Sequence, residues 1–147
     1  MVDVNGDIAR TLSYDRDTKE GTRAVTSQVD GSIRAHARAV QDSTSEIAAF
    51  LRDHLGAQLT ALLTDVDVRT VNRWAAGEGC PRESAEKRLR AAYQVFRLLE
   101  GFEASPTIRA WFMGMNPQLD DVSPTEAIAN DQYRDVMSAA RAFASGG

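Results

Sequence analysis

The sequence predicts an all-α fold. After residue 43, apolar side chains recur at three- and four-residue spacing, which is the spacing of helices that bury one face. Two helix starts carry recognisable caps, and no segment alternates with the two-residue period of a strand. At 147 residues and 43% hydrophobic composition, the chain suits one domain, or one domain with a loose arm.

Residues 1–42 are predicted to form a mobile or partly helical arm. The first thirty residues are rich in Asp, Thr, Gly and Arg and contain few large apolar side chains, so they bury too little surface to offset the entropy of ordering. A short helix from Ser32 to Gln41 is compatible with the positions of Ile33, Ala37 and Val40. The ordered domain is expected to begin near Ser43.

Two short amphipathic helices are expected at the start of this domain. Residues Ser43 to Ser45 provide a cap for the first, and Gly56 separates it from the second. The apolar faces are formed by Ile47, Phe50, Leu51 and His54 and then by Leu59, Leu62 and Leu63. Thr64 and Asp65 form the turn that follows.

The segment Val66 to Pro81 has the pattern of a recognition helix. Asp67 is placed to cap its start by accepting backbone N–H bonds. Val71 and Trp74 share an inner face, while the outer face carries Arg69, Asn72 and Arg73. The helix is stopped by Gly77, Gly79 and Pro81. Residues 43–81 are therefore predicted to be a helix-turn-helix DNA-binding region.

A longer helix is predicted from Arg82 to Glu100. It has a heptad-like apolar seam formed by Ala85, Leu89, Ala92, Phe96 and Leu99. The seam is compatible with packing inside its own domain or with a dimer contact. Further helices are expected from Pro106 to Met113, from the capping box at Ser123 to Glu126, and from Tyr133 to Phe143. Asn116 to Leu119 is expected to form a turn.

Charge and composition favour a binding protein over an enzyme. The net charge is −4, but residues 67–97 carry seven basic against four acidic side chains. The two histidines and the single Cys80 match no metal-ligand pattern, and no phosphate loop or nucleophile motif is present. We therefore expect no enzymatic activity, no cofactor and no metal. The unpaired cysteine, and the lack of a signal-peptide pattern or membrane-spanning run, favour the cytoplasm.

The predicted DNA contacts lie on the recognition helix and on the helix after it. Val68, Arg69, Asn72 and Arg73 are expected to face the major groove, where Arg reads guanine and Asn reads adenine. Arg73 is equally compatible with a phosphate contact. Backbone phosphates are the expected ligands of Arg82, Lys87 and Arg88, unless these side chains form an ordinary solvated face.

The chain from about Ile47 to Phe143 resembles the Xre/MbcA/ParS-type antitoxins of bacterial toxin–antitoxin pairs. In its first half the resemblance is carried by Leu59, Leu63, Val66, Asp67, Thr70-Val71, Arg73-Trp74, Gly77 and Pro81. In its second half it is carried by the long helix, Trp111-Phe112, Asn116-Pro117-Gln118-Leu119, Ser123 to Ile128 and the helix from Tyr133. Thr64-Asp65 departs from the family pattern, which commonly has Gly in the turn.

The resemblance implies an antitoxin of a type II system, with residues 82–147 as a helical toxin-binding and dimerisation domain. Its partner is then a RES-type toxin that degrades NAD, or an ADP-ribosylating relative, whose active site the antitoxin covers. The resemblance also implies autoregulation at operator DNA, and a homodimer or a larger toxin–antitoxin hetero-oligomer. Toxin contacts are expected at Trp111, Asn116, Pro117, Tyr133, Arg134, Met137, Arg141 and Phe143.

Two other functions are compatible with the sequence. One is a stand-alone helix-turn-helix transcriptional regulator without a toxin partner, whose carboxyl-terminal part only dimerises. The other is an interaction scaffold whose helix-turn-helix has lost DNA binding. A RES-type reading frame beside the gene would decide between the antitoxin and the stand-alone regulator.

Overall fold

A computed structural model describes residues 44–146, and the predicted arm with its Ser32 to Gln41 helix lies outside the described residues. The described part is helical throughout and contains no strand, so the all-α prediction is confirmed. A first helix covers residues 44–54 and is followed by α2 (Ala57–Thr64), α3 (Val68–Ala75), α4 (Glu83–Leu99), α5 (Ser105–Met113), the 3-10 turn η1 (Pro117–Leu119), α6 (Pro124–Ala129) and α7 (Tyr133–Ala144). No helix in this part has the length and hydropathy needed to cross a membrane.

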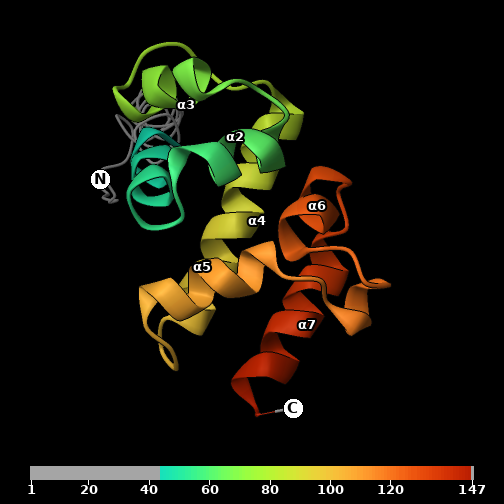
Figure 1. Cartoon of the computed structure of the whole chain (residues 1–147). Coiled ribbons are helices and arrows are strands. Elements are labelled where there is room, and N and C mark those ends of the chain that lie inside the picture. Colours follow the sequence, from blue (N-terminus) through green and yellow to red (C-terminus); the bar gives the residue numbers. More distant parts are fainter. Residues whose placement is uncertain (1–43, 147) are drawn as a thin grey trace, which may run out of the picture. The chain divides into compact units, whose positions relative to one another are not determined.

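Helix α4 is the central element of the described region (Figure 1). It packs against α2, α6 and α7, which places one element of the predicted DNA-binding half and two of the carboxyl-terminal half around it. All five seam residues named above are buried within this single chain. The seam is therefore part of the domain core and leaves no apolar stripe on α4 for a dimer contact.

Helix α2 buries threonines as well as leucines. Leu63 is buried, but Leu62 is 64% exposed, so its predicted inward position is wrong. Thr60 and Thr64 are buried instead. The hydroxyl of Thr60 donates to the carbonyl of Gly56 at 2.8 Å and that of Thr64 to the carbonyl of Thr60 at 2.6 Å. These bonds along the helix satisfy the hydroxyls, so the threonines turn inward without leaving an unpaired polar group in the core.

The turn between α2 and α3 is closed by Asp65 in the left-handed conformation, with φ of 60°. The N–H of Asp65 donates to the carbonyl of Leu62 at 3.3 Å, and the N–H of Val66 donates to that of Ala61 at 3.1 Å. This bond pair is a Schellman motif, in which glycine is the usual left-handed residue. Aspartate is among the few other residues that adopt this conformation readily, so the turn keeps its geometry despite the departure at Thr64-Asp65.

The caps predicted at Asp67 and Ser123 are present, whereas Ser43, where the cap of the first helix was predicted to begin, lies outside the described residues. One Asp67 carboxylate oxygen accepts from the N–H of Thr70 at 2.8 Å and from its hydroxyl at 2.6 Å. These bonds to the ionised form lower the pKa of Asp67. The hydroxyl of Ser123 accepts from the N–H of Glu126 at 3.0 Å at the start of α6. Both helices therefore begin where the sequence predicts.

The carboxyl-terminal half is built on the same core. Ile108 and Phe112 of α5 are buried, whereas Trp111 is half-buried. The buried hydroxyl of Thr125 in α6 donates to the carbonyl of Phe112 at 2.8 Å and so joins α6 to the end of α5. Val136 of α7 also lies in the core.

Candidate functional site

Helix α3 presents the predicted outer face to solvent. Val71 and Trp74 are buried beneath it. The exposed side chains are those expected to face the major groove, namely Val68, Arg69, Asn72 and Arg73. The sequence therefore gives the orientation of the recognition helix correctly, while its contact with DNA stays a prediction.

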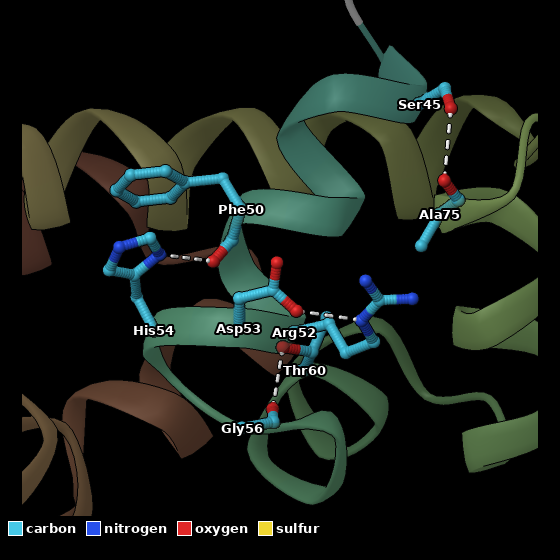
Figure 2. A network of polar contacts seen from close by, with 8 residues as sticks. All are labelled: Ser45, Phe50, Arg52, Asp53, His54, Gly56, Thr60 and Ala75. Atoms are coloured by element: carbon cyan, nitrogen blue, oxygen red, sulfur yellow. Dashed lines mark hydrogen bonds and ion pairs between the residues drawn. The ribbon is translucent and has the colours of Figure 1, made fainter.

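Helix α3 is held at both ends. Its start is capped by Asp67, and its last turn is bonded to the first described helix through the hydroxyl of Ser45, which donates to the carbonyl of Ala75 at 3.4 Å (Figure 2). The N–H of Glu78 donates to the carbonyl of Arg73 at 2.8 Å and closes the helix end. A helix fixed in this way presents its outer side chains in a defined direction, which suits recognition of a surface.

Three cations on this surface have no hydrogen bond or ion pair to any residue between 44 and 146. They are Arg69 and Arg73 of α3 and Arg82 at the start of α4. Lys87 forms an exposed ion pair with Glu83 at 3.3 Å, which is weak. Within residues 44–146, α3 and the start of α4 thus carry three guanidinium groups without a hydrogen-bond or ion-pair partner.

Arg88 differs from Arg82 and Lys87, the other two residues predicted to bind backbone phosphates, in its contacts. Its Nε donates to the Asp131 carboxylate at 2.9 Å, and its side chain is only 15% exposed. The same carboxylate accepts from the Tyr133 hydroxyl at 2.6 Å. Arg88 is thus neither a solvated side chain nor a free cation for phosphate, because it ties α4 to the loop before α7.

Two acids lie at the beginning of the recognition helix. Asp65 and Asp67 line a shallow hollow of about 380 Å³ together with Gln58, Ala61, Leu62, Val66 and Val68. Both side chains are exposed. Negative charge repels phosphate, so these two acids disfavour a phosphate contact at this end of α3.

A second concave surface lies between α5, η1 and α7. This carboxyl-terminal groove has a volume of about 550 Å³. It is lined by Glu103, Trp111, Met115, Asn116, Pro117, Gln118, Ala139, Phe143 and Gly146. The Trp111 and Phe143 rings lie 6.0 Å apart between centroids and form its aromatic part. Four of the predicted toxin-facing residues, Trp111, Asn116, Pro117 and Phe143, are thus brought together.

Exposed apolar side chains surround this region. Met115 is 81% exposed, Met113 55% and Phe102 60%. None of the three was predicted as a site residue, because single apolar residues at the end of a helix or in a loop give no periodic signal. The short spacing of Met113 and Met115 around Gly114, next to Trp111, is the only pattern in the sequence that marks them. Together with the groove they form an apolar surface of the kind found in protein interfaces.

The other four predicted toxin-facing residues lie outside the groove lining. Tyr133 is bonded to Asp131, and burial together with this bond raises the pKa of Tyr133 to about 12. Met137 packs against the core. Arg134 and Arg141 are exposed on α7 and have no partner within residues 44–146. They are seven residues apart, which places both on one face of the helix.

The two surfaces lie at opposite ends of the described region. Figure 1 shows α3 at one end of α4, and α5 with the last turn of α7 toward the other. The described residues contain no group of three side chains suited to a metal. His54 is engaged locally, since its Nδ1 donates to the carbonyl of Phe50 at 3.0 Å (Figure 2). The described residues thus contain two candidate binding surfaces, the outer face of α3 and the carboxyl-terminal groove.

Comparison with known proteins gives one informative match. No protein-family profile and no curated protein matches the sequence. The fold matches a chain of the crystal structure of the M. tuberculosis MbcT-MbcA toxin-antitoxin complex, with a TM-score of 0.61 and 22% sequence identity. This chain shares the fold of that protein. The similarity covers 69% of this chain and 94% of that one, so both halves of the other fold have a counterpart here.

Proposed function

We propose that this protein is the antitoxin of a type II toxin–antitoxin system. The supporting observation is the fold, which matches nearly the whole length of a chain from a toxin–antitoxin complex. The motif resemblance to the MbcA-type antitoxins covers the same helices. On this proposal the protein acts in the cytoplasm as an inhibitor by contact and not as an enzyme.

The carboxyl-terminal groove is the proposed toxin-binding surface. Its Trp111 and Phe143 rings and the exposed Met115 are the residue types that dominate the centres of protein interfaces. Arg134 and Arg141 on α7 add two unpaired guanidinium groups, which suit acidic or phosphate-binding positions on a partner. Binding of a toxin to the groove would bury these apolar side chains, which explains why they are exposed to water in the free protein.

The proposed partner is a RES-type toxin that degrades NAD. Neutralisation then follows from occupation of the toxin's active-site cleft by α7 and the groove, which excludes the substrate. Two or more antitoxin chains assemble with the toxin in this proposal, and their mutual contact lies outside the α4 seam because that seam is filled within each chain.

Co-expression with a RES-type toxin, the proposed partner, tests this function. The wild-type chain is expected to restore growth of cells that make the toxin. Met115→Asp and Phe143→Asp are expected to lose protection, because each places a charge in the proposed apolar contact. Leu62→Asp is the matched control, since it puts the same charge on an exposed apolar position of α2, away from the groove. Protection by both groove variants equal to that by Leu62→Asp would exclude the groove as the toxin-binding surface.

The helix-turn-helix face is proposed to bind operator DNA and to repress the antitoxin's own operon. Arg69 and Asn72, exposed on the first two turns of α3, are the proposed base contacts. Arg69→Ala is expected to weaken operator binding while leaving toxin binding unchanged. The alternative, a transcriptional regulator without a toxin partner, predicts operator binding but no protection in the co-expression experiment.

A further inference from the structure

Arg73 lies in an unusual place on the recognition helix. It belongs to the last turn of α3, and its guanidinium group reaches the loop that leaves the helix. A Cβ atom on Gly79 would stand 3.0 Å from Nη2 of Arg73. The side chain therefore rests close to the bare backbone of Gly79, and a Cβ at this position would require its guanidinium group to shift by a few tenths of an ångström.

The charge of Arg73 is not neutralised in this position. Glu78 precedes Gly79 directly, but its only bond to Arg73 is between backbone groups, from N–H to carbonyl at 2.8 Å. The guanidinium has no ion pair or hydrogen bond within the described part of the chain. Arg82, a second unpaired cation, follows three residues after Gly79. Glu78 and Glu83 are also exposed in and beside this loop, so the positive charge is confined to the side chains of Arg73 and Arg82.

The location separates Arg73 from the proposed base contacts. Residues at the start of a recognition helix reach base edges, whereas those at its far end and in the following loop lie along the sugar-phosphate backbone. Arg69 is one turn earlier and is free of the loop. The Arg73 guanidinium, directed toward Gly79, faces away from the start of the helix.

We infer that Arg73 binds a DNA phosphate and does not read a base, and that Gly79 is the residue that positions it. This inference rests on the proposed operator binding and specifies the role of one residue in it. A phosphate contact supplies affinity that is independent of sequence and that weakens with salt. Gly79 acts through Arg73 and has no contact of its own with the DNA.

Binding of the full-length protein to two duplexes of equal length tests the inference. One duplex carries the region upstream of its own gene, and the other a scrambled sequence. Arg73→Ala is expected to weaken binding to both by the same factor and to reduce the slope of log affinity against log salt by about 0.9. The loss then shrinks about 3.5-fold as salt rises from about 50 to about 200 mM.

Gly79→Ala tests the positioning role, and Gly77→Ala is its matched control. Both glycines have positive φ, +72° and +83°, so alanine strains the same loop in either variant. The nearest side chain to a Cβ on Gly77 is the Ser45 hydroxyl at 3.7 Å, not Arg73. Gly79→Ala is expected to change the salt slope in the same direction as Arg73→Ala, and to cause no further change when Arg73 is already alanine. Gly77→Ala is expected to leave the slope unchanged.

The outcomes separate this inference from the proposed function. Loss of operator affinity by about 5- to 150-fold with little effect on the scrambled duplex would mean that Arg73 reads a base, and would overturn the inference. A Gly77→Ala slope equal to that of Gly79→Ala would overturn the positioning role. A wild-type protein that binds both duplexes equally would contradict specific operator recognition, while the Arg73 slope would still be measured on either duplex.

Discussion

Phe96 is the residue whose loss most directly tests how the fold is held together. It lies in the last turn of α4 with no exposed surface. Its ring centroid is 5.3 Å from that of Phe50, 5.9 Å from His54 and 6.4 Å from Phe112. The first described helix, α4 and α5 therefore meet at this side chain, and Phe96→Ala leaves a cavity that none of the three fills by itself.

The cost of Phe96→Ala is expected to be about 3–5 kcal/mol, the range for removing a buried phenylalanine side chain. For a domain of this size, about 4 kcal/mol lowers Tm by roughly 20 °C. Thermal unfolding followed by circular dichroism measures the change, with the exposed Gln94→Ala on the same helix as control, expected to stay within about 0.5 kcal/mol. A loss below about 1 kcal/mol, or a difference from wild type that grows with dilution, would refute packing of the α4 seam within one chain.

Three further outcomes follow from single contacts. The hydrogen bond from Arg88 lowers the pKa of the Asp131 carboxyl, so this contact stabilises the fold above roughly pH 4 and is lost as pH falls further. Asp131→Asn is therefore expected to have a lower free energy of unfolding than wild type at pH 7 in urea unfolding. If the difference in free energy between the two proteins does not become smaller toward pH 2, the ion pair is contradicted. Thr125→Val leaves the carbonyl of Phe112 unpaired and costs about 1 kcal/mol in the same assay, and an unchanged stability would argue against that bond. Asp65→Asn keeps a residue that tolerates the left-handed turn but removes a negative charge beside α3. Operator affinity in a mobility-shift titration is therefore expected to rise, most at low salt. An affinity equal to that of wild type would show that Asp65 does not lie close to bound DNA.

Local signals in the sequence predict most of the helices. The caps at Asp67 and Ser123 and the seam of α4 depend on residues at most a few turns apart, and the structure has them where the sequence places them. Leu62 shows where such reasoning fails. A leucine at helical spacing is expected to be buried, but the neighbours of α2 contact its threonine face, whose hydroxyls are bonded along the helix.

The candidate sites are less predictable because they depend on contacts between distant residues. Arg88 and Asp131 are 43 positions apart, and no local pattern pairs them. The groove likewise requires Trp111 from α5 and Phe143 from α7 to meet. Sequence patterns therefore predict the helices on which these candidate surfaces lie. The exposure of Met115 and the proximity of Arg73 to Gly79 emerge only from the three-dimensional arrangement.

The most direct test of the antitoxin proposal is titration of the purified neighbouring RES-type toxin with this protein while NAD consumption is followed. We predict that NAD consumption falls in proportion to added protein and stops at a fixed stoichiometric ratio. Unchanged NAD consumption in the presence of excess protein would contradict the proposed function.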